Sequence, residues 1–240
     1  MKTAGILIVG DEVLSGEVRD ENGPWLLARL AALGSRVVRV GIVPDKKEEI
    51  VQELRRLRGA ADAVLVSGGI GPTHDDVTRP AVAEALGVPL EVHAEAEARV
   101  RQWYGDRTTP AELSMALLPR GARVLRGART NTLGFAAGGV YVMPGVPFLL
   151  RDILEGCAPE FAGASLHREE IHTTLREGEI APDLTLIPGR ALDVAIGSYP
   201  VMDDEGRWTT RIVVRSTDPS RSTAVAAEVR EAFTRLAAGG

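Results

Sequence analysis

The 240 residues suffice for one large domain or for a large and a small one, and the composition, 45% hydrophobic and 25% charged, is typical of a soluble globular protein. The net charge of −5, without a basic stripe, argues against nucleic acid as a partner, and every apolar run is too short to span a membrane. The one cysteine, Cys157, excludes an internal disulfide, fits a reducing cytoplasm and is expected to be a packed, inert thiol.

The first third of the chain predicts strands that alternate with helices. Short unbroken apolar runs are typical of strands covered on both faces, whereas apolar residues three and four apart are typical of helices with one buried face. Such alternation through short links implies a parallel sheet covered by helices. The predicted strands are residues 4–10, 36–43 and 62–69, and the predicted helices are residues 22–34, 46–59 and 79–87.

Residues that favour helix ends mark two of these helices. Asn22 suits the N-cap of the first helix, and Gly34 suits the position just past its end. Thr78 follows the third strand and suits the cap of the third helix. Polar segments also follow two of the strands, after Val9 and after Val66. Because ligands bind at the carboxyl ends of the strands in open parallel sheets, we expect a binding site there.

The regular alternation of predicted strands and helices ends in the second half of the chain. From about Glu91 the pattern is helical as far as residue 119, and strands and a closing helix follow before a strand-rich segment begins. We therefore expect two domains, residues 1–162 with a three-layer, mostly parallel α/β sheet and residues 163–240 with a small α+β fold. The predicted elements are strands at 122–125, 138–145, 167–176, 191–200 and 208–217 and helices at 146–156 and 222–240.

The stretch SGGIGPTHDDVT, residues 67–78, combines a glycine-rich turn with two adjacent aspartates. Gly68, Gly69 and Gly71 let the backbone approach an anionic ligand with its amides pointing inward. The alternative is a tight strand-to-helix turn without a ligand. If the turn binds phosphate, Gly69→Val is expected to lower ligand affinity much more than stability.

Asp75 and Asp76 place negative charge where a phosphate would bind. A divalent metal ion resolves this conflict, since Mg²⁺ takes one or two carboxylates together with phosphate oxygens and water. The alternative is that the pair supplies favourable charge at a helix N-terminus, worth about 0.3–1 kcal/mol. His74 either assists as an acid or base or simply faces solvent. Of the two aspartates, Asp76 is the stronger candidate for the metal.

Three segments resemble the signature segments of the molybdopterin-binding, MoaB/MogA-like fold, and more closely those of its CinA-type branch. GARTNTLGFAAGG (127–139) is also similar to that branch, and VAIGSYP (194–200) extends the resemblance. Many full-length CinA proteins carry a C-terminal amidase domain as well, whose activity we do not expect in a chain that ends at Gly240. The three segments are GDEVLSGEVRDEN (10–22), SGGIGPTHDDVT (67–78) and MPGVP (143–147).

The resemblance implies metal-dependent hydrolysis of a nucleotide pyrophosphate, with ADP-ribose or FAD as leading substrates and Mg²⁺, Mn²⁺ or Co²⁺ as the metal. The relatives in cofactor biosynthesis imply molybdopterin binding instead. A non-catalytic nucleotide sensor would use the same cleft, although the acidic pairs favour catalysis. We also expect a homo-oligomer, either a dimer or a trimer.

Further residues are expected to line the cleft. Asp11 and Glu12, at the end of the first strand, either complete the metal shell, hold a ribose hydroxyl or cap the next segment of the chain. Asn131, Thr132 and Gly134 are expected near the ring or ribose end of the ligand. The residues expected to bind the substrate are Gly68, Gly69, Gly71, Thr73, Asp11, Glu12, Ser15, Gly16, Asn22, Gly145 and Pro147, with Asp75 and Asp76 as the metal-binding and catalytic pair.

Aromatic residues outside these segments have two interpretations each. Trp103 and Tyr104 either stack on a base or pack, as aromatic residues at a helix end usually do. Tyr199 either covers the cleft of a neighbouring subunit or packs before a proline-bounded turn. Packing is favoured in both cases. Because the three signature segments all lie before residue 148, the chemistry is assigned to the first domain.

Overall fold

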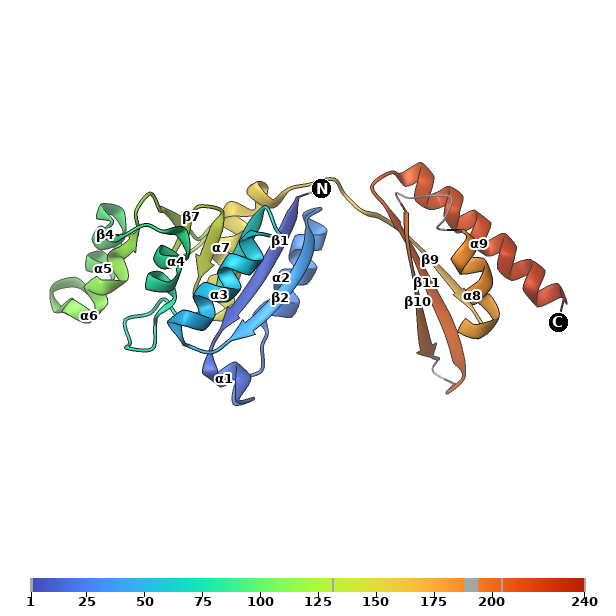
Figure 1. Cartoon of the computed structure of the whole chain (residues 1–240), viewed down its shortest axis with the longest axis horizontal. Helices are drawn as coiled ribbons and strands as arrows, with labels where there is room; N and C mark the ends of the chain where they lie inside the picture. The colour runs from blue at the N-terminus through green and yellow to red at the C-terminus, as the bar shows by residue number, and fades with distance from the viewer. Residues whose placement is uncertain (1, 131, 188–193, 204, 240) are drawn as a thin grey trace. The chain divides into compact units, whose positions relative to one another are not determined.

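The chain divides into two compact units in its computed structural model (Figure 1). The first unit is residues 1–163 and the second is residues 164–240. The boundary predicted after residue 162 lies one residue before the observed one. Among the helices described, none is long and apolar enough to cross a membrane. The residues that the structure describes are 2–130, 132–187, 194–203 and 205–239.

A six-stranded sheet forms the centre of the first unit (Figure 1). Five strands run in one direction, and β7 runs in the opposite direction between β8 and β6. The mostly parallel sheet predicted from the sequence is therefore confirmed. Across the sheet the strands are β2 (Arg36–Val43), β1 (Thr3–Val9), β3 (Ala63–Ser67), β8 (Val140–Met143), β7 (Leu133–Ala137) and β6 (Arg123–Arg126).

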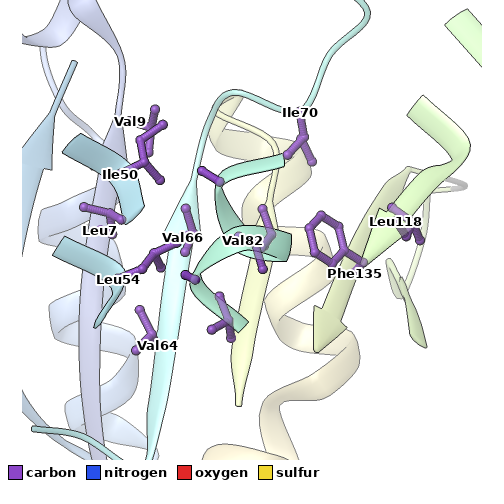
Figure 2. Packing of buried hydrophobic residues seen from close by; sticks show 14 of the residues in the cluster. Leu7, Val9, Ile50, Leu54, Val64, Val66, Ile70, Val82, Leu118 and Phe135 are labelled. Atoms are coloured by element: carbon purple, nitrogen blue, oxygen red, sulfur yellow. The ribbon is translucent and has the colours of Figure 1, made fainter. Parts of the chain in front are cut away.

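Helices cover both faces of this sheet, as a three-layer fold requires. Alternate residues of a strand point to opposite faces. Ile6 of β1 therefore shares one core with Leu26 of α2 and Ile153 of α7, whereas Leu7 shares the other with Leu54 of α3 (Figure 2). The helices are α1 (Asp11–Leu14), α2 (Asn22–Ala32), α3 (Lys47–Arg58), α4 (Thr78–Leu86), α5 (Ala94–Tyr104), α6 (Pro110–Leu113) and α7 (Pro147–Cys157).

Two of the predicted helix caps are wrong. Asn22 and Thr78 are the first residues of α2 and α4 and not their N-caps. The N-cap residue of α2 is Glu21, and the side chain of Asp20 supplies the capping bonds, because its Oδ1 accepts from the N–H groups of Asn22 and Gly23, both at 2.9 Å. Gly34 lies just past α2 with a φ of 80°, as predicted.

The prediction from the sequence is also wrong for part of the segment 90–119. The sequence predicts a helical pattern as far as residue 119, whereas β4 (Leu90–Val92) and β5 (Leu117–Pro119) pair in a separate two-stranded sheet. The helices α5 and α6 lie between these strands in the chain. β7 is not predicted, because Gly134 interrupts the pattern of a strand.

The second unit is a small α+β domain, as predicted. Its three strands are antiparallel in the order β10, β11, β9, and Ile212 of β11 shares a core with Ile180 of α8 and Val229 of α9. The sequence does not predict α8, because Pro182 lies inside it. The elements are β9 (His167–Thr173), α8 (Glu177–Leu186), β10 (Val194–Met202), β11 (Trp208–Ser216) and α9 (Pro219–Gly239).

Cys157 is a buried thiol at the end of α7, as predicted. Its Sγ donates to the carbonyl of Ile153 at 3.4 Å, and burial raises the pKa of the thiol to about 12. Because the thiolate is the reactive form, we expect the folded protein not to react with a thiol reagent at about pH 8. The protein unfolded in guanidinium is the control and should be fully labelled. Rapid labelling of the folded protein would contradict this packing.

Candidate functional site

A cleft opens at the carboxyl ends of the four neighbouring parallel strands β2, β1, β3 and β8. Each strand contributes the residues that follow it, which is where ligands bind in such sheets. The cleft has a volume of about 470 Å³. Its lining residues are Val9, Gly10, Glu12, Asp45, Gly68, Gly69, Ile70, Gly71, Asp75, Asp76, Pro144, Gly145 and Val146.

The turn after β3 requires glycine at two positions. Gly68 and Gly69 have φ values of 104° and 68°, which residues with a side chain rarely adopt. A Cβ on Gly68 would collide with the carbonyl oxygen of Val9, and a Cβ on Gly69 would collide with the hydroxyl of Thr78. Gly145 approaches the same turn, since a Cβ there would lie 3.5 Å from the Gly68 Cα. The glycines therefore let the ends of β1, β3 and β8 meet.

The carboxylate of Asp76 closes this turn from within. Its Oδ1 accepts a hydrogen bond from the Gly71 N–H at 2.7 Å, and its Oδ2 accepts from the N–H and hydroxyl of Thr73 at 2.9 and 2.5 Å. The sequence assigns such amides to a ligand phosphate, but an internal anion holds these two. Oδ1 accepts a single hydrogen bond here and keeps acceptor capacity for another partner.

Carboxylates from three strand ends surround the cleft. Glu12 follows β1, Asp45 follows β2, and Asp75 and Asp76 follow β3. Burial raises the pKa of Asp45, and the charges of Glu12, Asp11 and Asp75 raise it further, although the hydrogen bond from the Asp11 N–H at 2.8 Å acts in the opposite direction. These charges are thus close enough to repel one another.

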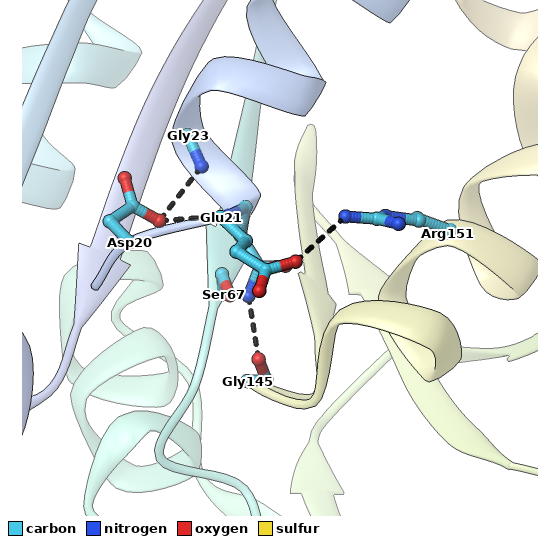
Figure 3. A network of polar contacts seen from close by, with 7 residues as sticks. Asp20, Glu21, Gly23, Ser67, Gly145 and Arg151 are labelled. Atoms are coloured by element: carbon cyan, nitrogen blue, oxygen red, sulfur yellow. Dashed lines mark hydrogen bonds and ion pairs between the residues drawn. The ribbon is translucent and has the colours of Figure 1, made fainter. Parts of the chain in front are cut away.

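Asn22 supports the cleft from behind. Its side chain is only 6% exposed, and its Nδ2 donates to Ser67 Oγ at 2.9 Å and to the Gly145 carbonyl at 2.6 Å. Its Oδ1 is buried without a hydrogen-bond partner among the described residues. Figure 3 shows Ser67 and Gly145 below the start of α2, where an ion pair between Glu21 and Arg151 at 3.2 Å joins α2 to α7. Asn22 thus fixes the walls of the cleft without lining it.

Several predicted residues lie beside the cleft and do not line it. Ser15 and Gly16 are exposed just past α1, and Thr73 and His74 are exposed on the turn after β3. Pro147 is the first residue of α7, directly after the lining residue Val146. These residues shape the loops around the site.

Other predicted residues belong to the packed body of the first unit. Thr132 and Gly134 are buried at and within β7, and neither lines the cleft. Asn131 lies outside the described residues. Trp103 is 53% exposed, and Tyr104 packs against the hydrophobic core with its ring 6.1 Å from that of Trp103. Neither aromatic residue lines the cleft, and the packing role is seen for Tyr104.

Tyr199 packs on its own sheet in the second unit. Its hydroxyl would lie 2.8 Å from a Cβ on Gly197, so the ring covers that glycine. Arg215 donates to the hydroxyl at 3.1 Å, and the guanidinium of Arg211 lies 5.4 Å from the ring centroid. These contacts agree with packing, although no turn directly follows Tyr199, because β10 continues through Pro200 to Met202.

Asp152 of α7 holds the loop that leads into β7. Its side chain is 2% exposed and accepts hydrogen bonds from the Arg129 N–H at 2.9 Å and from the N–H and hydroxyl of Thr130 at 2.7 and 2.6 Å. Burial acts to raise the pKa of Asp152, but the bonds from Thr130 and Arg129 outweigh it and lower the pKa. The ionised carboxylate is therefore the form that fixes the loop.

Replacing Asp152 with asparagine is expected to lower the free energy of unfolding by about 1–3 kcal/mol at neutral pH, because asparagine has a single acceptor oxygen for donors that use both oxygens of the buried carboxylate. Since the folded pKa lies below the ordinary value of 3.8, this stabilisation is present above that value and is lost as the pH falls through the folded pKa. Urea unfolding of both proteins across the acid range checks this. A difference in stability that grows as the pH falls would contradict it.

Sequence reasoning missed Asp45, which is the clearest addition to the site. It follows β2 in the segment 44–46, just as Glu12 follows β1. The rule that ligands bind at the carboxyl ends of parallel strands applies to this segment as well. The short Pro-Asp-Lys link reads as an ordinary loop until the strand order places it beside β1.

Comparisons with known proteins cover both units. Residues 5–163 match the family described as "Probable molybdopterin binding domain", and residues 165–238 match "FAD synthase, middle domain". A protein of Pyrobaculum calidifontis is 36% identical over 217 residues, which is 83% of this chain and 81% of that protein. A CinA-like protein of Anaeromyxobacter sp. (strain K) is 35% identical over 88% of this chain, which spans 51% of its length.

A solved structure shows the same relationship. The protein CinA of Thermoplasma acidophilum, described as having unknown function, aligns with a TM-score of 0.63 and 32% identity. The alignment covers 67% of this chain and 98% of that protein. Fold, sequence and the matched residues agree. The chain therefore belongs to the probable molybdopterin binding domain family, in its CinA-like branch.

Proposed function

We propose that the chain hydrolyses the diphosphate of a nucleotide such as ADP-ribose or FAD, with a divalent metal ion at the cleft of the first unit. The observation that carries the proposal is the cleft lining, where glycine backbone meets four carboxylates. Among the described residues that line it, none is basic. A diphosphate placed there would be repelled unless a cation lies between the two sets of charges.

The donor set fits such an ion. Carboxylate oxygens suit Mg²⁺ and Mn²⁺, and Co²⁺ also accepts them. Within the described residues, no three histidine, cysteine, aspartate or glutamate side chains converge into a group that could hold a metal. Mg²⁺ usually takes one or two carboxylates and completes its shell with phosphate oxygens and water. We therefore propose an ion that binds together with the nucleotide, with Asp75 and Asp76 as its protein ligands.

The residues of the chain have distinct tasks in this proposal. When bound, the ion polarises the phosphate oxygens and lowers the pKa of a water molecule. Asp76 keeps the glycine turn closed before the ligand arrives, which reduces the cost of ordering it. The N–H groups of Gly69 and Ile70 donate to no other described residue and are available to a phosphate oxygen. Glu12 and Asp45 provide carboxylates that can orient the attacking water.

The family description supports a second candidate, molybdopterin binding in cofactor biosynthesis. Molybdopterin and the nucleotides each carry phosphate beside a large ring system, so one cleft suits either. The match of the second unit to the middle domain of FAD synthase favours the nucleotide. A non-catalytic nucleotide sensor would use the same residues, and only the formation of product separates it from a hydrolase.

The binding part of the proposal is tested by calorimetric titration of ADP-ribose into the full chain, with Mg²⁺ and again with EDTA. We expect binding with Mg²⁺ and none detectable with EDTA. The exposed loop variant Asp106→Asn is the matched control, since it removes a carboxylate outside the cleft. Equal affinity in both conditions would refute a metal-dependent site.

We also propose that the chain forms a homo-oligomer, a dimer or a trimer. β2 is an edge strand, and its Val38, Val40 and Ile42 are 37–42% exposed. An unpaired edge with exposed apolar side chains favours self-association. Sedimentation equilibrium of the wild type and of Ile42→Lys tests this, with a smaller species expected for the variant. A monomeric wild type would refute it.

The cytoplasmic location remains a prediction.

A further inference from the structure

A buried arginine lies beneath the glycine turn. Arg79, in the first turn of α4, is 6% exposed, and its guanidinium donates to the carbonyl oxygens of Ile70 and, at 2.9 Å, Gly71. Burial lowers the pKa of Arg79, and the charge of Asp76 opposes this shift. An arginine stays protonated in proteins. A buried, fully charged guanidinium therefore binds the two backbone carbonyls.

These contacts dictate where the turn directs its amides. In a trans peptide, the C=O of one residue and the N–H of the next point in opposite directions, and the described chain has no cis peptide bond. The Ile70 carbonyl points to Arg79, so the Gly71 N–H points the other way, to Asp76 Oδ1 at 2.7 Å.

The preceding peptide is oriented in the same manner. The Gly69 carbonyl accepts a hydrogen bond from the Thr78 N–H of α4 at 3.0 Å. The Ile70 N–H therefore points away from α4, and it meets no acceptor among the described residues. Ile70 lines the cleft, so this unpaired donor belongs to its wall.

We propose that Arg79 is a positioning residue that holds the glycine turn and the Asp76 carboxylate in place at the cleft. By drawing the Ile70 carbonyl toward α4, it directs the Gly71 amide to Asp76, while the bond from the Thr78 N–H to the Gly69 carbonyl orients the Ile70 amide. This inference rests on the proposed function and adds a residue that never touches the ligand. Arginine suits the task, because its planar fork donates in two directions at fixed geometry.

The test compares Arg79→Gln and Arg79→Lys with the matched control Arg58→Gln. Arg58 also donates to a backbone carbonyl, that of Ala85 at 3.3 Å, at the far end of α4. The affinities of Mg²⁺-ADP-ribose and Mg²⁺-pyrophosphate are measured by calorimetry at a temperature where all variants are folded. Arg79→Gln is expected to weaken both ligands at least about tenfold, the loss of one charge-assisted hydrogen bond. Arg79→Lys should restore part of the affinity, and Arg58→Gln should match the wild type.

Hydrogen exchange of the Gly71 amide, followed by NMR, tests the inference without any ligand. The bond to Asp76 should protect this amide in the wild type and in Arg58→Gln, and protection should fall in folded Arg79→Gln. If the wild type binds neither ligand, the proposed function fails, whereas lost Gly71 protection in Arg79→Gln would still support the positioning role. Unchanged Gly71 protection and unchanged affinity in folded Arg79→Gln would overturn the inference.

Discussion

Replacing Asp76 with asparagine is expected to reduce nucleotide hydrolysis by about 100-fold or more, a loss typical of a metal site that loses a ligand or its support. The structure adds a second cause. Asp76 accepts three hydrogen bonds from Gly71 and Thr73 across both of its oxygens. Asparagine has one acceptor oxygen, and its amide group would face an N–H donor. The glycine turn should therefore loosen as well.

Steady-state release of AMP at saturating metal measures this effect, with Asp106→Asn as the control. Asp106 lies in an exposed turn and does not line the cleft. Thermal unfolding monitors whether the rest of the first unit stays intact, as we expect. Turnover by Asp76→Asn equal to that of the wild type would contradict the assignment of Asp76 as a metal-binding and catalytic residue.

Replacing Gly69 with alanine is expected to lower the free energy of unfolding by about 1–3 kcal/mol, the cost of a residue with a side chain at a positive φ. The new Cβ would also collide with the buried hydroxyl of Thr78. From the sequence alone, a side chain at this position is expected to obstruct the ligand and to affect affinity more than stability. The structure changes that expectation, because the group in the way belongs to the protein.

A double-mutant cycle separates the two costs. Thr78→Ala removes the hydroxyl that the new Cβ meets, so Gly69→Ala should cost less stability in that background. The strain of the positive φ should remain in both backgrounds. Urea unfolding of the wild type, the two single variants and the double variant gives the coupling energy. Full stability of Gly69→Ala alone would mean that the turn does not have the geometry described.

Much of the fold was predictable because its signals are local. A continuous apolar run such as 63–66 marks a buried strand wherever it pairs. The failures have specific physical causes. β4 and β5 are three residues each and exist only because they pair across the segment 93–116. Pro182 lies inside α8 and prevents its prediction from the sequence, although packing against the surrounding core keeps the helix intact.

The candidate site divides in the same way. Gly68 and Gly69 stand out in the sequence because their spacing signals a turn that few residues permit. The role of Asp76 within that turn depends on the chain folding back on itself, which the sequence does not reveal. Asp45 and Arg79 enter only when strand order and helix packing bring them to the turn.

The most direct test of a metal-dependent pyrophosphatase is product analysis with the full chain. ADP-ribose, FAD and NAD are each incubated with the protein in Mg²⁺, Mn²⁺, Co²⁺ or EDTA, and AMP is quantified. We predict that at least one nucleotide yields AMP with a metal and none with EDTA, and that ADP-ribose releases AMP and ribose 5-phosphate in equal amounts. The absence of AMP from all three nucleotides with every metal, in a folded protein, would contradict the proposed activity.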